Sequence, residues 1–376
     1  MTAGYLRPTK AKIDCKAIFH NVQTEKERLN KETELFAVVK ANGYGHGAVE
    51  VANIAKQAGA TGFCVAILDE ALELRSAGIT EPILVLGMID PLHIGYLLKE
   101  NLTCAAISTE WLEAAIKNWP SDNKSKLKIH AKIDSGMGRV GLRSDEEINH
   151  FLEIIEAHPE FDLEGIFTHF SKADSSDKSY FKLQQARFSK ALSLFPKEVR
   201  YVHTSNSATA LWHDHWQSNL VRFGAAMYGL NPSGRELTPP YELKQAMTLE
   251  TELVQVKKLE AEEGISYGAT YYTETEEWIG TLPIGYADGF TRNFQGFKVL
   301  VDGNRCPIVG RVCMDQCMIK LPKSYPVGTK VIIFGDDEKG NNISFQDAAE
   351  YIGTINYEIP CVLSERVPLV YVNECD

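Results

Sequence analysis

Residues 35–47, LFAVVKANGYGHG, place a lysine directly after an apolar run and directly before a glycine-rich turn. The apolar run is typical of a buried strand, and the glycines allow a backbone to approach a ligand closely. An ammonium group at the end of a core strand loses water, which lowers its pKa and makes Lys40 a candidate for Schiff-base chemistry. The plainer interpretation is a lysine that reaches solvent before an ordinary loop that holds Tyr44 and His46.

Working outward from this segment, short β-branched runs alternate with amphipathic stretches up to about residue 230. The predicted strands are 35–40, 62–67, 82–86, 103–107, 127–133, 163–169, 199–203 and 220–223, and the predicted helices are 48–58, 69–77, 110–119, 145–157 and 180–195. Such alternation indicates parallel strands with right-handed crossovers. An open doubly wound sheet fits the alternation too, but eight strands favour a closed, TIM-like (β/α)8 barrel.

The character of the chain changes after residues 229–240, GLNPSGRELTPP, which suit a domain junction. Beyond them the predicted strands are 249–256, 278–284, 297–301, 307–312, 318–321 and 330–334. Asp302-Gly-Asn304 is typical of a hairpin turn, and a helix is expected at 344–351. We therefore predict a barrel over 13–240 and a mostly β domain over 241–376.

Composition narrows the function classes. The chain has 376 residues and a formal net charge of −11, which argues against nucleic-acid binding. It has no apolar run of membrane-spanning length, and its first residues lack a signal peptide, so we expect a cytoplasmic protein without a membrane partner. The eight cysteines are scattered, and Cys313 with Cys317 lacks further ligands, so free thiols are expected rather than a metal site.

Polar side chains end five of the eight predicted barrel strands. They are Lys40, Lys132 with Asp134 and Arg139, His169, His203, and Arg222. A single histidine after a strand is usually a satisfied structural group, but the carboxyl ends of barrel strands meet at the rim where catalysis occurs. Their coincidence at one rim favours a site.

Three segments of this rim have alternative interpretations. Arg139 lies among three glycines, which suits anion capture or a plain solvated loop. Lys132 lies inside a strand, so it should be paired, neutral or chemically modified. Residues 203–209, HTSNSAT, suit either a phosphate site or a helix cap. The last segment and Arg222 fall after strands 7 and 8, where TIM barrels often bind phosphate.

Nine motifs in this order resemble bacterial alanine racemases over essentially the whole chain. They are VVKANGYGHG, KIDSGMGRVG, THF, HTSNS, RFGAAMYG, SYGATY, PIGYADG, GRVCMDQ and INYEIP. The resemblance implies a (β/α)8 barrel followed by a β domain that residues 1–12 join as a strand. It also implies a head-to-tail homodimer whose two active sites are shared between subunits.

The resemblance also implies residue roles. Lys40 would bind pyridoxal 5′-phosphate as an internal aldimine and act as one catalytic base, with Tyr267 of the other subunit as the opposite base. The implied cofactor-binding residues are Tyr44, His169, His203, Ser207, Arg222, Gly224, Ala225 and Tyr357. Arg139 and Met314 would bind the substrate carboxylate. Lys132 matches a lysine that is carbamylated in some members, and the substrate access channel would be lined by Asp69, Asp174, Tyr286, Arg292 and Arg311. The role of Lys172 is left open, because it falls where family sequences vary.

The resemblance, with these residue roles, implies interconversion of L-alanine and D-alanine, with D-alanine supplied to peptidoglycan. The cofactor acts as an electron sink, and inversion needs a proton acceptor on one face and a donor on the other. Alternatives are a decarboxylase of the same architecture, which would use Cys313 or Cys361, and a racemase of serine or of broad specificity. A non-catalytic cofactor carrier is a further alternative, although such carriers lack the β domain.

Overall fold

A computed structural model describes residues 2–121, 124–213 and 218–374. The chain forms two compact units. One, here called the β unit, comprises Met1–Ala17, Tyr228–Leu230 and Lys244–Asp376, and the other, the barrel unit, comprises Ile18–Met227 and Asn231–Leu243. Each is described by itself.

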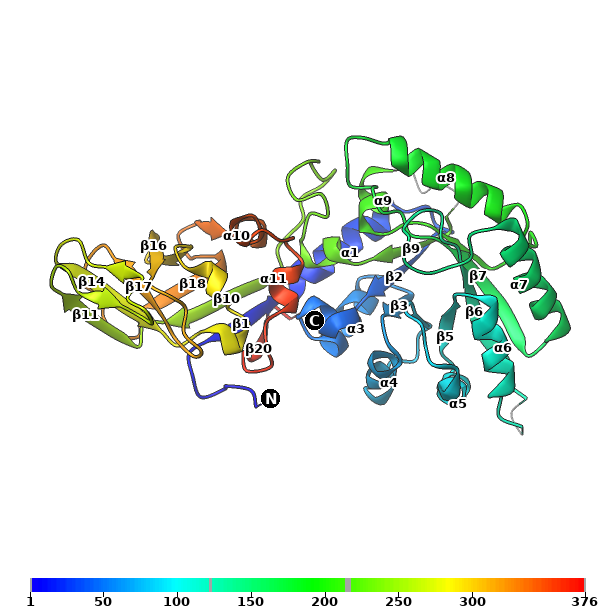
Figure 1. The fold of residues 1–376 in the computed structure, drawn as a ribbon, viewed down its shortest axis with the longest axis horizontal. Helices are drawn as coiled ribbons and strands as arrows, with labels where there is room; N and C mark the ends of the chain where they lie inside the picture. Colours follow the sequence, from blue (N-terminus) through cyan, green and yellow to red (C-terminus); the bar gives the residue numbers. More distant parts are fainter. Residues whose placement is uncertain (1, 122–123, 214–217, 375–376) are drawn as a thin grey trace. The chain divides into compact units, whose positions relative to one another are not determined.

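The barrel unit contains eight parallel strands in the order β8-β7-β6-β5-β4-β3-β2-β9 (Figure 1). The strands are β2 (Glu34–Val38), β3 (Gly62–Val65), β4 (Ile83–Val85), β5 (Thr103–Ala106), β6 (Leu127–Lys132), β7 (Phe161–Phe167), β8 (Tyr201–His203) and β9 (Leu220–Phe223). Beyond β8, a parallel bridge between Ser205 and Val221 brings the two ends of the sheet together. The predicted TIM-like barrel is therefore confirmed.

All five helices that the alternation predicted are present, together with others that it did not predict, one of which precedes the first barrel strand. They are α1 (Cys15–Arg28), α3 (Ala48–Gln57), α4 (Leu68–Ser76), α5 (Ile94–Lys99), α6 (Thr109–Lys117), α7 (Asp145–Ala157), α8 (Ser179–Leu192) and α9 (Ser207–Trp212), with short 3-10 turns η1 (Pro91–His93) and η2 (Ala225–Tyr228). Within the described residues, no helix is both long enough and apolar enough to cross a bilayer.

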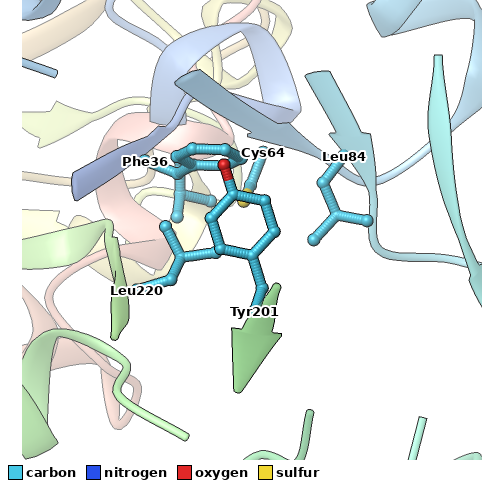
Figure 2. Close-up of a cluster of buried hydrophobic side chains, with 6 residues drawn as sticks. Phe36, Cys64, Leu84, Tyr201 and Leu220 are labelled. Atoms are coloured by element: carbon cyan, nitrogen blue, oxygen red, sulfur yellow. The ribbon is translucent and has the colours of Figure 1, made fainter. Parts of the chain in front are cut away.

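Apolar side chains from several strands fill the barrel interior. Figure 2 shows one cluster, in which Phe36, Cys64, Leu84, Tyr201 and Leu220 meet, all of them buried. The rings of Phe36 and Tyr201 contact edge to face, with centroids 5.9 Å apart. Burial raises the pKa of Cys64 to about 12, so this thiol is unreactive at neutral pH.

Several predicted barrel strands end one or two residues early, and in two of them this places a candidate site residue beyond the strand. The strand predicted to end at Lys40 ends at Val38, and the one predicted to end at His169 ends at Phe167. The pairing explains both corrections, because the last paired residues are Val38 with Cys64 and Phe167 with His203. Lys40 and His169 therefore follow the strands rather than belong to them.

The glycine-rich turn expected after β2 is left-handed and forms α2 (Lys40–Tyr44). The φ angles are 52° for Ala41, 52° for Asn42, 61° for Gly43, 52° for Tyr44 and 79° for Gly45. Consecutive left-handed residues are costly for L-amino acids other than glycine, so outside contacts must hold this conformation.

Two side chains supply those contacts. The Asn42 Oδ1 accepts a hydrogen bond from the Ala48 N–H at 3.0 Å, which ties the turn to α3. The Glu70 carboxylate accepts from the Ala41 N–H at 2.6 Å and from the Ala66 N–H at 2.7 Å. Glu70, in the first turn of α4, thus joins the backbone next to Lys40 to the end of β3.

The β unit contains a sheet in the order β11-β14-β17-β16-β15-β18-β10-β1-β20, with β19 beside β18. Its strands are β1 (Lys10–Asp14), β10 (Met247–Glu252), β11 (Gln255–Leu259), β14 (Glu277–Leu282), β15 (Lys298–Val301), β16 (Asn304–Val309), β17 (Cys317–Leu321), β18 (Lys330–Asp336), β19 (Asn342–Ile343) and β20 (Leu369–Val372). A separate pair is formed by β12 (Gly264–Ile265) and β13 (Tyr271–Tyr272). The unit also holds α10 (Phe345–Ile352), α11 (Glu358–Cys361), η3 (Tyr286–Asp288) and η4 (Arg292–Phe294).

Two predicted strands of this unit need correction and one turn is confirmed. The strand predicted at 307–312 lies at Asn304–Val309. The run 249–256 divides into β10 and β11, because the Leu253 N–H bonds to the Thr329 carbonyl whereas the Val254 N–H bonds to the Thr281 carbonyl. The chain thus changes partner strands between these two residues. The predicted hairpin turn joins β15 and β16, with φ of 52° at Asp302 and 83° at Gly303.

The Glu70 contacts predict the effect of one substitution. Replacing Glu70 with Gln removes the charge and leaves a single carbonyl oxygen as acceptor, so we expect a loss of about 1–3 kcal/mol in the free energy of unfolding. Denaturant unfolding of both proteins measures it. The control is Glu73→Gln on the exposed face of the same helix, which should change stability by less than about 0.5 kcal/mol. Equal stabilities of the two variants would contradict the role assigned to Glu70.

Candidate active site

Five of the predicted site residues lie at the carboxyl ends of adjacent barrel strands. Lys40 follows β2, Lys132 ends β6, His169 follows β7, His203 ends β8, and Arg222 lies within β9. The parallel pairing of β6 through β9 and β2 brings these ends to one rim.

Positive groups surround His169. Burial lowers its pKa well below the ordinary value, and the charges of Arg222, Lys132, Arg139 and Lys40 lower it further. His169 is therefore neutral at physiological pH, and its Nε2 lies 3.4 Å from the Asn206 Nδ2. An imidazole under the influence of four cationic groups indicates a rim suited to anions.

The pKa of Lys132 is strongly perturbed. Its side chain is buried, its Nζ donates to the Ile133 carbonyl at 3.0 Å, and it lies 5.0 Å from the centre of the Phe167 ring. Burial and the charge of Arg222 lower its pKa to about 7, against the opposing effect of Asp134. A substantial fraction of Lys132 is therefore an uncharged, nucleophilic amine at neutral pH.

The loop that holds Arg139 is organised by Asp134. The Asp134 Oδ1 accepts hydrogen bonds from the Gly136 N–H at 3.0 Å and the Gly138 N–H at 2.9 Å. The Tyr180 hydroxyl donates to the Gly136 carbonyl at 2.7 Å. Arg139 itself is exposed, so its guanidinium is presented to solvent from a fixed backbone.

The predicted phosphate-binding residues of the barrel unit come together. The Gly224 N–H donates to the Ser207 Oγ at 2.8 Å, so the residue that follows β9 contacts the first residue of α9. A Cβ added at Gly224 would lie 3.0 Å from the Tyr44 hydroxyl oxygen, so Tyr44 of α2 reaches the same place. Ala225 follows Gly224 at the start of η2. Three separate elements thus converge on one small polar cradle.

The remaining barrel residues lie outside this cradle. Asp69 is exposed in the first turn of α4. Asp174 is partly buried in the segment after β7, and that burial raises its pKa. Lys172, in the same segment, pairs with Asp177 at 2.6 Å.

The β unit carries the other predicted residues, several of which adjoin one another. Tyr267 is 72% exposed and lies in a turn where Ser266 and Gly268 have positive φ. The Ser266 hydroxyl donates to the Arg311 carbonyl at 2.6 Å, and the Ala287 N–H, next to Tyr286, donates to the Met314 carbonyl at 3.0 Å. Arg292 is exposed in η4, and Tyr357 precedes α11.

Sequence analysis missed three residues that adjoin the predicted set directly or through one neighbour. They are Glu70 beside the left-handed turn, and His130 with Glu164 behind His203. His130 lies two residues before Lys132 in β6, so it shares a face of the strand with that predicted residue, and this spacing was the available signal. The carboxylates gave no local signal because their partners are distant in sequence.

Two family models match the chain in succession. Residues 13–232 match the alanine racemase N-terminal domain, and residues 246–371 match the alanine racemase C-terminal domain. Among curated proteins, the alanine racemase of Latilactobacillus sakei is 52% identical, with 99% of this chain and 98% of the relative covered. That of Pediococcus pentosaceus is 51% identical, with 99% and 98% covered.

Solved structures of racemases are also similar to this chain. Alanine racemase from E. faecalis is 53% identical with a TM-score of 0.96, covering 99% of this chain and all of that one. The Bacillus anthracis enzyme with bound L-Ala-P is 47% identical with a TM-score of 0.95, covering 98% and 96%. A histidine racemase from Leuconostoc mesenteroides is 31% identical with a TM-score of 0.92, covering 98% and 99%. The chain therefore belongs to the alanine racemase family and is an isomerase, a pyridoxal-phosphate-dependent racemase.

Proposed function

We propose that this protein interconverts L-alanine and D-alanine by a two-base mechanism at the carboxyl rim of the barrel. The observation that carries the proposal is the gathering of Lys40, Lys132, Arg139 and Arg222 around neutral His169. A rim of this charge suits a substrate carboxylate and a phosphorylated cofactor. The full-length similarity to alanine racemases supports alanine as the substrate.

The residues of this rim fit pyridoxal 5′-phosphate. When bound, this cofactor supplies the electron sink that allows the α-proton of an amino acid to leave. Lys40 would hold it covalently. The cradle of Tyr44, Ser207 and Gly224, with Ala225 and Tyr357, would hold its phosphate, because hydroxyl and backbone N–H donors suit that anion.

Arg222 would face the ring nitrogen of the cofactor. Its guanidinium is buried, and even with a pKa lowered by burial to about 10 it remains charged at neutral pH. A group that donates and never accepts a proton keeps that nitrogen unprotonated. His203 would support Arg222 from behind, because its Nδ1 lies 2.7 Å from the Arg222 Nη1.

The proton transfers would be divided between two side chains. Lys40 would accept or donate the α-proton on one face of the substrate, and Tyr267 of the partner subunit would do so on the other. The exposure of Tyr267 supports this assignment, because a surface side chain is available to a second copy of the chain. Arg139 and the Met314 N–H of the partner subunit would hold the substrate carboxylate.

Further parts of the proposal rest on the family alone. The working domains would be residues 1–12 together with 241–376, and residues 13–240. The protein would act as a homodimer in the cytoplasm and supply D-alanine to peptidoglycan. Asp69, Asp174, Tyr286, Arg292 and Arg311 would line the access channel.

The central test is chiral chromatography of L-alanine incubated with the purified protein and pyridoxal phosphate. We expect a near-equal mixture of the two enantiomers, which the Lys40→Ala variant should not produce. The control is Lys117→Ala, an exposed lysine on α6 that should leave the rate unchanged. Parallel incubations with serine and histidine test breadth. Conversion of either in place of alanine, or release of carbon dioxide, would overturn the substrate assignment.

The second base is tested separately with Tyr267→Phe. Racemisation should fall by about 10²–10⁴-fold, because each direction needs both a donor and an acceptor. In D2O, one enantiomer should still exchange its α-proton through Lys40. The matched control is Tyr272→Phe, another exposed tyrosine of the β unit. If Tyr267→Phe racemises alanine at the normal rate, Tyr267 is not a base.

The uncharged fraction of Lys132 predicts a carbamate, since carbon dioxide reacts only with the neutral amine. Because its pKa is about 7, that fraction grows as the pH rises through neutrality. With 13C-labelled bicarbonate, a carbamate carbonyl signal should therefore increase between about pH 6 and pH 8. Lys132→Ala should abolish the signal, and Lys128→Ala, on the same strand, should keep it. A wild-type spectrum without this signal at either pH would mean that Lys132 stays unmodified.

A further inference from the structure

Arg222 has an unusual set of partners for a buried cation. Only 3% of the residue is exposed. Its Nη2 donates to the Thr168 carbonyl at 2.9 Å and the Thr204 carbonyl at 3.4 Å, and its Nη1 donates to the His203 Nδ1 and carbonyl. All are neutral acceptors, and across residues 2–121, 124–213 and 218–374 no carboxylate forms an ion pair with it. An uncompensated buried charge is costly, so a more distant counter-charge is expected.

The proton positions on two histidines follow from this contact. A guanidinium has no lone pair to offer, so the His203 Nδ1 must be the acceptor. A neutral His203 then carries its proton on Nε2, which lies 2.8 Å from the His130 Nδ1. By the same logic His130 carries its proton on Nε2, which lies 3.4 Å from the Glu164 Oε2. The four side chains form one chain of hydrogen bonds with a single polarity.

Burial and charge keep both imidazoles neutral. Burial lowers the pKa of His203 well below its ordinary value, and the charge of Arg222 lowers it further. Burial also lowers the pKa of His130, against the opposing effect of Glu164. Burial alone would raise the pKa of Glu164, but the hydrogen bond from His130 and nearby positive charges lower it, so this carboxylate stays ionised.

The packing around the chain accommodates these rings. A Cβ at Gly165 would lie 2.6 Å from the His130 ring, so the absence of a side chain there makes room for the imidazole. The Phe167 ring stacks on the His203 ring with centroids 4.7 Å apart and an interplanar angle of 5°. The Arg222 guanidinium lies 5.5 Å from the centre of the same Phe167 ring. The members come from the consecutive strands β6, β7, β8 and β9.

We propose that Glu164 and His130 are positioning residues for Arg222. Through two neutral imidazoles they fix the orientation of the guanidinium and supply its counter-charge from a distance. This inference rests on the proposed function for the role of Arg222 toward the cofactor. A carboxylate directly beside Arg222 would also lie close to the ring nitrogen and would favour its protonation. The relayed carboxylate stabilises the cation without that effect.

The chain itself is tested by NMR of the full-length protein with 15N-labelled histidine, before and after addition of pyridoxal phosphate. At about pH 7 both His203 and His130 should be singly protonated, with the proton on Nε2 and Nδ1 as an acceptor. Resonances are assigned from His130→Gln and His203→Gln. A doubly protonated His130, or a His203 proton on Nδ1, would overturn the proposal. This result does not depend on racemase activity.

Coupling along the chain is tested with Glu164→Gln. Its matched control is Glu34→Gln, because Glu34 also faces Arg200, at 3.6 Å against 3.5 Å for Glu164, and is bonded to Tyr201 rather than to His130. Glu164→Gln should move the Nε2–H proton resonances of both His130 and His203 upfield, and Glu34→Gln should move neither. A shift confined to His130 would overturn the relay.

The effect on catalysis separates a positioning role from a merely structural one. Glu164→Gln should lower kcat about 10-fold to 100-fold, with KM for alanine changed by less than about twofold, as for outer residues that orient a site. Its bound cofactor should also show an altered absorption spectrum. Unchanged kcat and spectrum would overturn the proposal. A wild-type protein without racemase activity would instead overturn the proposed function and leave the NMR prediction standing.

Discussion

The concentration of positive charge at one rim of the barrel is the constraint on which the site depends. Lys40, Lys132, Arg139 and Arg222 all act on His169, and two of these four are buried. Such a cluster destabilises an empty protein and becomes favourable when anions bind. Two members of the rim lose charge as a result. Burial and the neighbouring basic side chains lower the pKa of His169, and burial and Arg222 lower that of Lys132.

The order of the barrel strands determines which side chains can contact the buried cation Arg222. Consecutive strands of a parallel barrel lie side by side. Side chains from four separate strands can therefore contact one another inside the barrel. Arg222 and Glu164 are on strands separated by β8, yet two histidines connect them. The same order brings Ser207 beside Gly224. The strand order that connects Arg222 to a carboxylate thus also forms the proposed phosphate-binding cradle.

Much of the fold could be predicted from the sequence, because apolar periodicity is local. The strand at Leu220–Phe223 and the helix at Asp145–Ala157 were predicted at their observed bounds. The ends of β2 and β7 were not, since pairing with the neighbouring strand decides where a strand stops. The division between β10 and β11 likewise depends on partners that lie far along the chain.

For the candidate site, the positions of five residues at or next to strand ends could be predicted from the sequence, and their roles stay predictions. The left-handed turn after Lys40 was beyond this approach, because Ala41 and Tyr44 are not residues that usually adopt positive φ. The hydrogen bond from the Ala41 N–H to Glu70, which stabilises this turn, joins segments about thirty residues apart, so no local sequence pattern predicts it. The contact between His130 and His203 joins strands that lie far apart in the sequence, so it could not be predicted locally.

The left-handed turn also bears on how the protein becomes active during folding. Ala41, Asn42 and Tyr44 each occupy a conformation that costs about 1–2 kcal/mol in an isolated chain, so this turn cannot form early by itself. It is held by Glu70 from α4 and by the start of α3, so it depends on elements that follow it in the chain. We therefore expect the lysine to reach its working position late in folding. Attachment of the cofactor at Lys40 would then serve as a natural reporter of a finished barrel.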